Sequence, residues 1–335
     1  MSSPKPPAAE TLREADRKHV TDFLAEQANY NSQATVERKE SDLRALAEWM
    51  DSNGFGEFSD VTPRDFKHYI RDVINDGYSA STARNRHYSA KTFYQWMENE
   101  GVGDIPSGFD ITERLSKGQI KTMNGKSEKE KQSFDFYLKK EDVDKIIENA
   151  PHPKVKYQLL IRLMWETGLR AGEAARVRLK NIHWEDHGIT VKTLKSDGDR
   201  RTVWHSRSLG VLLRTYVHAG ERDSAYSANT SPYLFAMDKA NHITPHRVNK
   251  IVKKGAKRAG LQETMYEDKR GFKRVKVTSH VLRHSYAVHC VKDGMDIQTL
   301  RKLMGHSDIA VTQRYLRFRN EDLKNKARRY GPGGN

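Results

Sequence analysis

Six side chains in the second half of the sequence are of types that carry out nucleophilic and acid–base chemistry. They are Arg170, Lys195, His280, Arg283, His306 and Tyr315. Two guanidinium groups can hold the non-bridging oxygens of one phosphodiester and stabilise the charge of its pentacoordinate transition state. A tyrosine hydroxyl can attack the phosphorus, while a histidine accepts its proton and a lysine protonates the leaving 5′ oxygen. The set therefore predicts strand cleavage of a nucleic acid without ATP, cofactor or metal.

Each of these residues also has a simpler interpretation. Arg170 could pair with Glu173 on a helix surface, and Tyr315 is one of 14 tyrosines, most of which serve packing. His280 and His284 have the i, i+4 spacing of metal ligands, but no Glu lies between them as in His-Glu-x-x-His, and no third ligand is evident. The hypothesis depends on the joint occurrence of the six residues.

The segments around these residues have mostly helical patterns. An apolar helix is expected over 155–165, interrupted at Gly168, and further helices are expected near 247–259, 280–292 and 297–304. Helices so arranged would position the arginines and histidines at their ends and turns.

Residues 188–204 alternate with a period of two instead. Ile189 and Val191 precede a turn of Ser, Asp and Gly, and the alternation resumes at Thr202, which predicts a β-hairpin. Lys195 lies at the turn of this hairpin, from which a side chain can reach a bound nucleic acid.

The first third of the chain has the apolar spacing of a small all-helical domain. Thr62 and Pro63 are of the types favoured at the N-cap and at the first position of a helix. Another helix is expected over 81–97, with an exposed basic stripe of Arg84, Arg86 and Lys91. Residues 101–136 combine glycines with lysines, a composition that indicates a flexible basic linker.

Composition narrows the class of protein. The 335 residues carry a net charge of +15, and this excess is uneven, because residues 1–106 have a net charge of −5 and residues 107–335 one of +20. A basic surface is typical of nucleic-acid binding, although it can also serve solubility.

The single cysteine, Cys290, excludes an intramolecular disulfide and a cysteine-rich zinc site. Mean hydropathy of −0.84, with no long apolar run and no signal-peptide pattern, favours a cytoplasmic, DNA-associated protein over a membrane or secreted one.

Three short segments resemble the sequence boxes of the tyrosine recombinase (phage integrase) family. Thr167–Glu173 is similar to the family's first arginine box, and His280–His284 to its His-x-x-Arg box. Leu303–Ser307 followed by Arg314-Tyr315 is similar to the Leu-Gly-His box that leads to the nucleophile, with Met304 where the family usually has Leu. All three boxes occur in the family order, with a hairpin lysine between the first two.

The resemblance implies a role for each residue. Tyr315 would be the nucleophile, and Arg170 and Arg283 would hold the scissile phosphate. His280 would be the general base, and His306 would hydrogen-bond the phosphate or orient the site. Lys195 would be the general acid, with Lys192 as the alternative because the turn is slightly longer than usual. The resemblance also implies that Glu173 supports the arginine or the local fold, and that the helix with Arg84, Arg86 and Lys91 faces DNA.

The predicted fold is mainly helical with a small β-hairpin or sheet. It combines a helical, SAM-like, core-binding N-terminal domain with a mixed α+β catalytic domain of the tyrosine recombinase type. The expected segments are a disordered leader (1–10), the core-binding domain (11–104), a basic linker (105–137), the catalytic domain (138–320) and a tail that docks on a neighbouring protomer (321–335).

The predicted function is site-specific DNA recombination. The resemblance implies a covalent 3′-phosphotyrosine, a Holliday junction, a homotetramer on double-stranded DNA with a specific core site, and an accessory directionality factor. Two alternatives use the same residues. A type IB topoisomerase-like enzyme would nick and reseal one strand, and a catalytically silent relative would only bind DNA.

Overall fold

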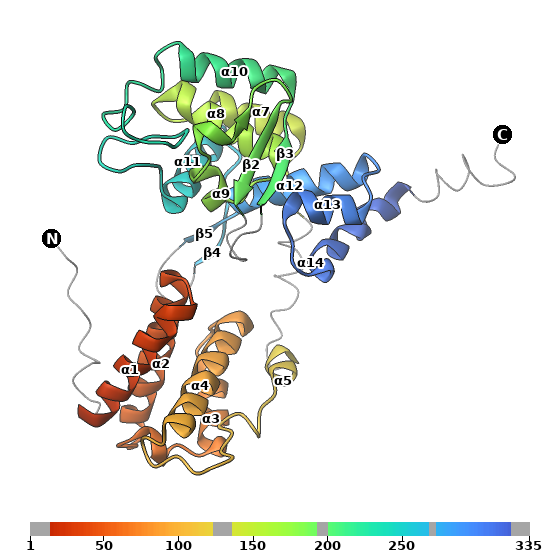
Figure 1. The fold of residues 1–335 in the computed structure, drawn as a ribbon. Helices are drawn as coiled ribbons and strands as arrows, with labels where there is room; N and C mark the ends of the chain where they lie inside the picture. The colour runs from red at the N-terminus through yellow and green to blue at the C-terminus, as the bar shows by residue number, and fades with distance from the viewer. Residues whose placement is uncertain (1–13, 123–135, 193–199, 268–272, 323–335) are drawn as a thin grey trace, which may run out of the picture. The chain divides into compact units, whose positions relative to one another are not determined.

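The computed structural model describes residues 14–122, 136–192, 200–267 and 273–322 (Figure 1). The chain divides into two compact units, the first of which includes residues 14–122 and the second the remaining described residues. Each unit has its own apolar core and is described separately below. No helix in the described ranges has the length and apolar character needed to cross a membrane.

The first unit is entirely helical within its described residues. Its elements are α1 (Glu14–Tyr30), α2 (Gln33–Ser52), the 3₁₀ turn η2 (Phe58–Asp60), α3 (Pro63–Asn75), α4 (Ala80–Glu100) and α5 (Lys117–Thr122). Thr62 caps α3 as predicted, because its hydroxyl accepts a hydrogen bond from the backbone N–H of Asp65 and Pro63 opens the helix. Helix α4 packs against α1, α2, α3 and α5 and is the centre of this unit.

Part of the predicted linker belongs to this first unit. Ile111, Leu115 and Ile120 are at most 1% exposed and lie in the same core as the helices before them. The prediction of a flexible linker is therefore wrong for residues 109–122, where an apolar residue every four or five positions fixes the segment against the unit. The rest of the predicted linker, 123–135, lies outside the described residues.

The second unit combines helices with two small antiparallel sheets. Its elements up to the middle of the unit are α7 (Lys140–Glu148), α8 (Lys154–Thr167), α9 (Ala171–Ala175), the 3₁₀ turn η3 (Leu179–Asn181), β1 (Ile182–His183), β2 (Gly188–Lys192), β3 (Arg200–Trp204) and α10 (Arg207–His218). The later elements are α11 (Pro245–Arg258), β4 (Thr264–Glu267), β5 (Lys273–Val275), α12 (Ser279–Lys292), α13 (Ile297–Met304), α14 (Ile309–Gln313) and the 3₁₀ segment η4 (Arg314–Asp322).

Helix α8 organises this unit. Its apolar sequence packs against α7, α10, α11 and α12, and Leu159, Leu160 and Leu163 are completely buried. The helix ends at Gly168, whose positive φ of 63° is the left-handed conformation that favours glycine at a helix C-terminus. The chain turns there into α9, so the end of α8 brings the Thr167–Glu173 segment into the interior.

The predicted hairpin is confirmed as β2 and β3, with β1 as an unpredicted third strand in the order β1-β2-β3. Ile189 pairs with Val203, and Val191 pairs with Arg201. Side chains directly opposite each other lie on the same face of a sheet, and Ile189, Val191 and Val203 are buried. Arg201 therefore projects from the buried face of the hairpin.

The predicted fold class is confirmed. The described residues form a mainly helical structure with a small three-stranded sheet, in an all-helical first unit and a mixed α+β second unit. The strands β4 and β5 were not predicted from the sequence.

Candidate active site

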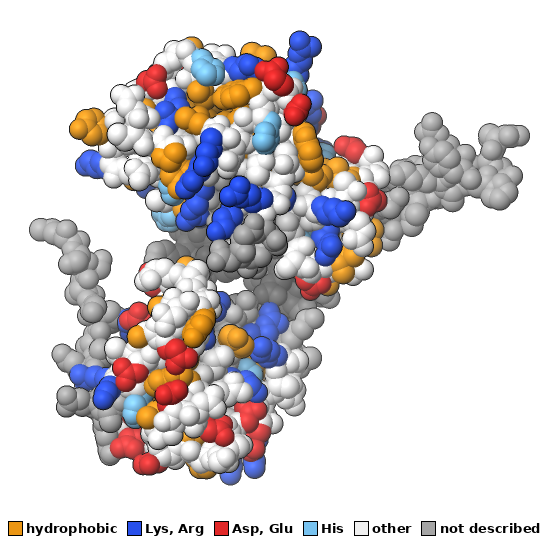
Figure 2. Space-filling model, viewed as in Figure 1, with side chains coloured by type: hydrophobic (Ala, Val, Ile, Leu, Met, Phe, Trp, Pro, Cys, Tyr) orange, Lys and Arg blue, Asp and Glu red, His pale blue; other side chains and the backbone are white. Residues whose placement is uncertain are grey.

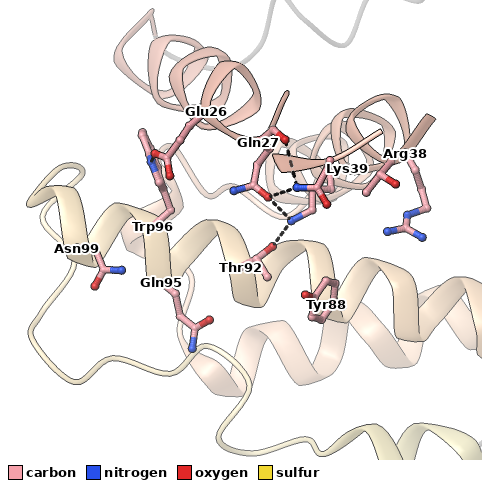
Figure 3. Close-up of a pocket in the computed structure, with 11 residues that line it drawn as sticks. Glu26, Gln27, Arg38, Lys39, Tyr88, Thr92, Gln95, Trp96 and Asn99 are labelled. Carbon is pink, nitrogen blue, oxygen red and sulfur yellow. Dashed lines mark hydrogen bonds between the residues drawn. The ribbon is translucent and has the colours of Figure 1, made fainter. Parts of the chain in front are cut away.

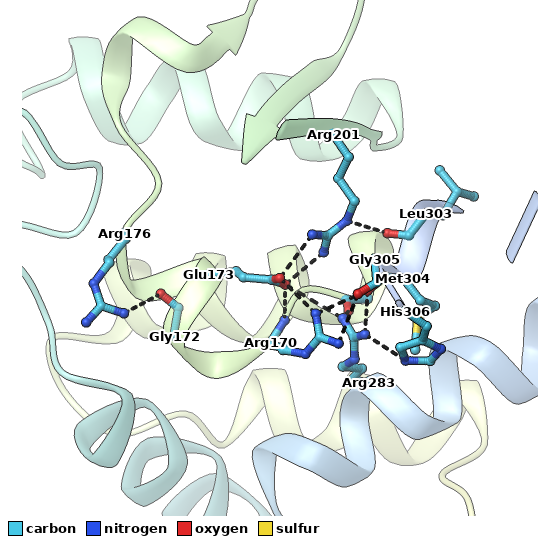
Figure 4. Close-up of polar contacts among 11 residues, drawn as sticks. Arg170, Gly172, Glu173, Arg176, Arg201, Arg283, Leu303, Met304, Gly305 and His306 are labelled. Atoms are coloured by element: carbon cyan, nitrogen blue, oxygen red, sulfur yellow. Dashed lines mark hydrogen bonds and ion pairs between the residues drawn. The ribbon is translucent and has the colours of Figure 1, made fainter. Parts of the chain in front are cut away.

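Glu173 is the centre of the cluster that brings the sequence boxes together (Figure 4). Its side chain is completely buried at the start of α9. Its Oε2 accepts a hydrogen bond at 2.8 Å from the backbone N–H of Arg170, the N-cap residue of the same helix. Its Oε1 accepts one at 3.0 Å from Nη1 of Arg170. The predicted Arg170–Glu173 pair therefore exists, but its carboxylate is internal rather than on a helix surface.

Arg201 on β3 is a second partner of this carboxylate. Its Nη1 and Nη2 donate to Oε1 and Oε2 of Glu173 at 3.0 and 2.8 Å, the bidentate geometry in which a guanidinium binds a carboxylate most strongly. Sequence reasoning missed Arg201. The available signal was its position two residues before the apolar Val203, which places both side chains on one face of the strand.

Arg283 on α12 is the third guanidinium at the cluster. It is 2% exposed, and its Nη1 donates to the carbonyl of Gly168 at 2.6 Å and lies 3.7 Å from Oε2 of Glu173. Three guanidinium groups thus surround one carboxylate, which leaves two positive charges uncompensated among these four side chains. The surrounding cations hold the pKa of Glu173 below its ordinary value despite its burial.

The three arginines also bind the end of α13. Nε of Arg201 donates to the carbonyl of Leu303 at 2.7 Å, Arg283 donates to that of Met304 at 2.6 Å, and Arg170 donates to those of Met304 and Gly305 at 3.3 and 3.2 Å. The last carbonyls of a helix have no partner within the helix and carry partial negative charge. These contacts fix the turn that leads to His306.

His306 is held in one tautomer. Nη2 of Arg283 lies 3.0 Å from Nε2 of His306, and because a guanidinium can only donate, Nε2 accepts. Nδ1 then carries the proton and donates to Oγ1 of Thr312, 2.9 Å away. Burial and the charges of Arg283, Arg170 and Arg201 lower the pKa of His306 to about 4. His306 is therefore neutral at physiological pH, with both ring nitrogens engaged.

His280 and Tyr315 lie beside this cluster. His280, near the start of α12, is open to solvent, yet partial desolvation and the charges of Arg283, Arg170 and Arg314 lower its pKa. Tyr315 is 6% exposed and packs against the ring of His284, with centroids 5.3 Å apart. Burial raises the pKa of Tyr315, and the charges of Arg283 and Arg314 oppose that rise. The structure therefore brings Arg170, Arg283, His280, His306 and Tyr315 into one electrostatic neighbourhood.

The candidate general acids are Lys195 and, as the alternative, Lys192. Lys195 lies in 193–199, outside the described residues. Lys192, the alternative, ends β2 and is exposed. The exposed basic residues at the hairpin end are Lys192 and Arg200, and Lys302 on α13 is also exposed. Figure 2 shows Lys and Arg side chains on the viewed face of the second unit. Figure 2 also shows Asp and Glu side chains spread over the first unit, whose sequence is acidic.

The exposed basic stripe predicted for α4 is wrong in part. Arg86 is 8% exposed, and its guanidinium lies over the ring of Tyr78, 4.5 Å from the centroid. Lys91 is half-buried and forms an ion pair with Asp110 at 2.9 Å, and Arg84 is also half-buried. Helix α4 is covered by four other helices, so few of its positions face solvent.

A polar pocket of about 440 Å³ lies between α1, α2 and α4 of the first unit (Figure 3). Lys39 is 3% exposed at its wall and donates to Oε1 of Gln27 at 3.0 Å and to Oγ1 of Thr92 at 2.9 Å. Exposed Arg38 and Tyr88 line the same pocket. Arg38 on α2 and Tyr88 on α4 are therefore exposed, unlike Arg86.

Comparison with known proteins assigns the chain to a class. Residues 137–321 match the phage integrase family and residues 21–101 match the phage integrase N-terminal SAM-like domain. The chain therefore belongs to the phage integrase family.

Its curated relatives include Xer recombinases. The chain is 28% identical over 271 residues to tyrosine recombinase XerA of Pyrococcus furiosus, a match that covers 80% of each chain. It is 26% identical over 312 residues to tyrosine recombinase XerD of Haemophilus influenzae, covering 90% of this chain and 93% of the relative. The protein is a Xer-like tyrosine site-specific recombinase, an enzyme that exchanges DNA strands.

Solved structures share the fold. The XerH recombinase bound to palindromic difH DNA has a TM-score of 0.63 at 18% identity, covering 92% of this chain and 83% of that one. The Tn1549 transposon integrase bound to transposon right-end DNA has a TM-score of 0.64 at 16% identity, covering 92% and 99%.

Proposed function

We propose that this recombinase cleaves DNA by attack of the Tyr315 hydroxyl on a phosphodiester held by Arg170 and Arg283. The new bond joins the tyrosine oxygen to phosphorus, the bond from phosphorus to the 5′ oxygen breaks, and a 3′-phosphotyrosine results. Attack by the 5′ hydroxyl of a partner strand reverses the chemistry, so the phosphodiester energy is conserved. The observation that carries this proposal is the convergence of the three arginines on Glu173 and on the turn before His306.

His280 is the general base in this proposal. Its lowered pKa keeps the ring neutral at physiological pH, so it can accept the tyrosine proton. His306 is less suited to that task, because Arg283 occupies its Nε2 and Thr312 its Nδ1 proton. Its neutral ring instead orients Arg283 toward the phosphate. Lys195, or Lys192 in its place, gives the proton to the 5′ oxygen.

The substrate we propose is double-stranded DNA with a specific core site, recombined through a Holliday junction by four copies of this chain. Two solved structures support the DNA part: XerH recombinase is bound to its difH substrate, and a lambda integrase dimer is bound to a core site. An accessory directionality factor is part of the same proposal. Arg84 and Lys91 on α4, together with Arg38 at the pocket in Figure 3, are the DNA contacts we propose for the first unit.

A covalent-trapping assay tests this proposal. Wild type and Tyr315→Phe are incubated, with EDTA present, with nicked, end-labelled duplexes from the DNA around the chain's own gene. A nick just downstream of the cleavage site lets the short fragment with the free 5′ hydroxyl diffuse away, so the covalent intermediate accumulates. We expect a denaturant-resistant protein–DNA band in wild type and none in Tyr315→Phe. A band of equal intensity in both would move the nucleophile elsewhere, and no band in wild type despite DNA binding would refute the proposed chemistry.

A second assay tests strand exchange. Two duplexes of different length, each with the cleavage site, are incubated together with the wild-type protein. Recombinant products and four-way junctions are then resolved on native gels. We expect both. A parallel incubation uses supercoiled DNA. Its relaxation, with no recombinant product from the duplexes, would indicate a topoisomerase-like reaction and contradict the proposed exchange.

A further inference from the structure

Among the described residues of the β2–β3 hairpin, the buried face carries one charged side chain that the proposed chemistry does not use. Arg201 pairs with Val191 across the hairpin, yet its side chain reaches past the sheet to two other segments of the unit. It forms the bidentate ion pair with Glu173 and donates to the carbonyl of Leu303. It is thus bonded to both the start of α9 and the end of α13.

We propose that Arg201 is a positioning residue for DNA cleavage, which balances the charge of Glu173 and fixes the turn before His306. This inference rests on the proposed function, because it assigns to Arg201 an effect on the phosphate site formed by Arg170 and Arg283. Arg201 itself does not need to touch the DNA.

The first part of the argument is charge balance. Glu173 is bonded to Arg170 and lies 3.7 Å from Arg283, so its negative charge offsets part of the positive charge that a phosphate would meet. Arg201 places a third positive charge on the same carboxylate with two hydrogen bonds. The side chains of Glu173, Arg170, Arg283 and Arg201 together carry a net charge of +2. Without Arg201, the other three carry a net charge of +1. Charge interactions are stronger away from water, so this difference acts directly on an anionic phosphate.

The second part is geometry. Gly305 follows α13 with a φ of 59°, and a Cβ at that position would lie 2.7 Å from Nη1 of Arg201 and 2.9 Å from its Cζ. The guanidinium therefore packs directly on the backbone of the turn, in a space that only glycine leaves open. Arg170 and Arg283 bind the next carbonyls of the same turn. Loss of Arg201 would release one of three anchors of this turn and allow the phosphate-binding arginines to shift.

The variants that test this proposal are Arg201→Met, Arg201→Lys and a matched control, Arg214→Met. Arg214 lies on α10, where it pairs with Glu185 and the carbonyl of Trp184, away from Glu173. The readout is the single-turnover rate of covalent adduct formation with the nicked duplexes described above, at saturating protein and per folded molecule. The folded fraction comes from circular dichroism and thermal melting of each variant.

We expect Arg201→Met to form adduct about 100-fold more slowly than wild type, the scale of loss when a reacting group is misplaced by about 1 Å. We expect its half-saturating protein concentration to change by less than about 3-fold, because Arg201 contributes little to DNA binding as such. Arg201→Lys keeps a positive charge near Glu173 but not the bidentate geometry. Its rate of adduct formation should therefore lie between those of wild type and Arg201→Met. Arg214→Met should match wild type.

A substrate with a methylphosphonate at the cleavage site separates the charge effect of Arg201 from its effect on the geometry of the turn. This substitution removes the negative charge of the phosphate. If Arg201 acts through charge balance, the rate difference between wild type and Arg201→Met should be at least about 10-fold smaller on this substrate. A rate within 3-fold of wild type on phosphate would overturn the proposal, and an equal difference on both substrates would overturn its charge-balance part.

If Arg201→Met does not fold, Arg201→Lys decides by the same two substrates. Failure of this inference is distinct from failure of the proposed function. In the first case wild type forms a Tyr315-dependent adduct and the Arg201 variants form it equally fast. In the second case wild type forms no such adduct.

Discussion

Nη2 of Arg283 donates a hydrogen bond to Nε2 of His306 over 3.0 Å, which joins α12 to the turn after α13. This contact has two consequences. It forces the proton of His306 onto Nδ1, and it keeps a permanent positive charge next to the ring. A histidine in such a place resists protonation, which supports the proposal that it orients the arginine rather than shuttling protons.

The tautomer of His306 can be tested at Thr312, which is completely buried. Thr312→Val removes the hydroxyl that accepts the Nδ1 proton and leaves a buried donor without its partner. We expect the rate of adduct formation to fall about 10-fold and the free energy of unfolding to fall by about 1–2 kcal/mol. Thr312→Ser keeps the hydroxyl and should restore most of both. Equal behaviour of the Val and Ser variants would show that this hydrogen bond does not hold the ring.

Acid should destabilise the second unit through His306. Its pKa is about 4 in the folded protein and near 6.5 when unfolded, so the unfolded chain takes up the proton first. The stability that this neutral histidine contributes is fully present above about pH 6.5 and is lost as the pH falls toward 4, by about 3 kcal/mol. Urea unfolding of wild type and His306→Gln between pH 7 and 4 measures this. We expect a shallower decline in the variant, and parallel curves would contradict the assignment.

The proposed base predicts the pH dependence of cleavage. Because the pKa of His280 is lowered, its neutral form persists below the ordinary titration range of histidine. Single-turnover adduct formation should therefore stay constant as the pH falls to about 6.5 and decline only below it. In His280→Gln the rate should be lower throughout, without this acid decline. An unchanged acid limb in the variant would assign the titration to another group.

Gly305 should tolerate no side chain. Gly305→Ala places a methyl group at a positive φ and 2.7 Å from Nη1 of Arg201. We expect a loss of about 2–3 kcal/mol in the free energy of unfolding and a slower adduct reaction. Gly260→Ala is the matched control, since Gly260 also has a positive φ, of 72°, but open space around it. Its expected loss is about 1 kcal/mol, so the difference between the two variants measures the contact with Arg201.

Arg86 should affect folding and not DNA affinity. Its guanidinium is buried over Tyr78 and close to Tyr69, so Arg86→Met removes cation–π contacts from the interior of the first unit. We expect a loss of about 1 kcal/mol in stability, with the DNA dissociation constant of the folded variant unchanged. Half-buried Arg84 gives the contrast, because Arg84→Met should weaken DNA binding and leave the melting temperature near that of wild type. A weaker DNA affinity in Arg86→Met would restore the original prediction of a continuous basic stripe.

The elements that carry the site could be predicted largely from local sequence. The helices at 245–258, 279–292 and 297–304 have caps and apolar spacing that are visible in the chain itself. The β2–β3 hairpin has a clear alternation with turn residues between the strands. Strand β1, with only two residues, and the short strands β4 and β5 have too few residues for any pattern.

What could not be predicted depends on contacts between distant segments. Arg201 acquires its partners only when β3 packs beside α9 and the end of α13. Arg86 is buried because four helices surround α4, which no periodicity within α4 reveals. The apolar signal of this segment is present in Ile111, Leu115 and Ile120, but the polar and charged residues between them, with Gly118, obscure an apolar face that only packing makes evident.

The order of the site residues along the chain has a consequence for biosynthesis. The carbonyls of Leu303, Met304 and Gly305, which all three arginines bind, come after those arginines in the sequence, and Tyr315 comes later still. A ribosome releases Arg170, Arg201 and Arg283 before it releases the turn that aligns them. A chain whose translation stops before residue 303 therefore has neither an aligned phosphate site nor the proposed nucleophile. We therefore expect copies of the chain that stop before residue 303 to leave DNA uncleaved.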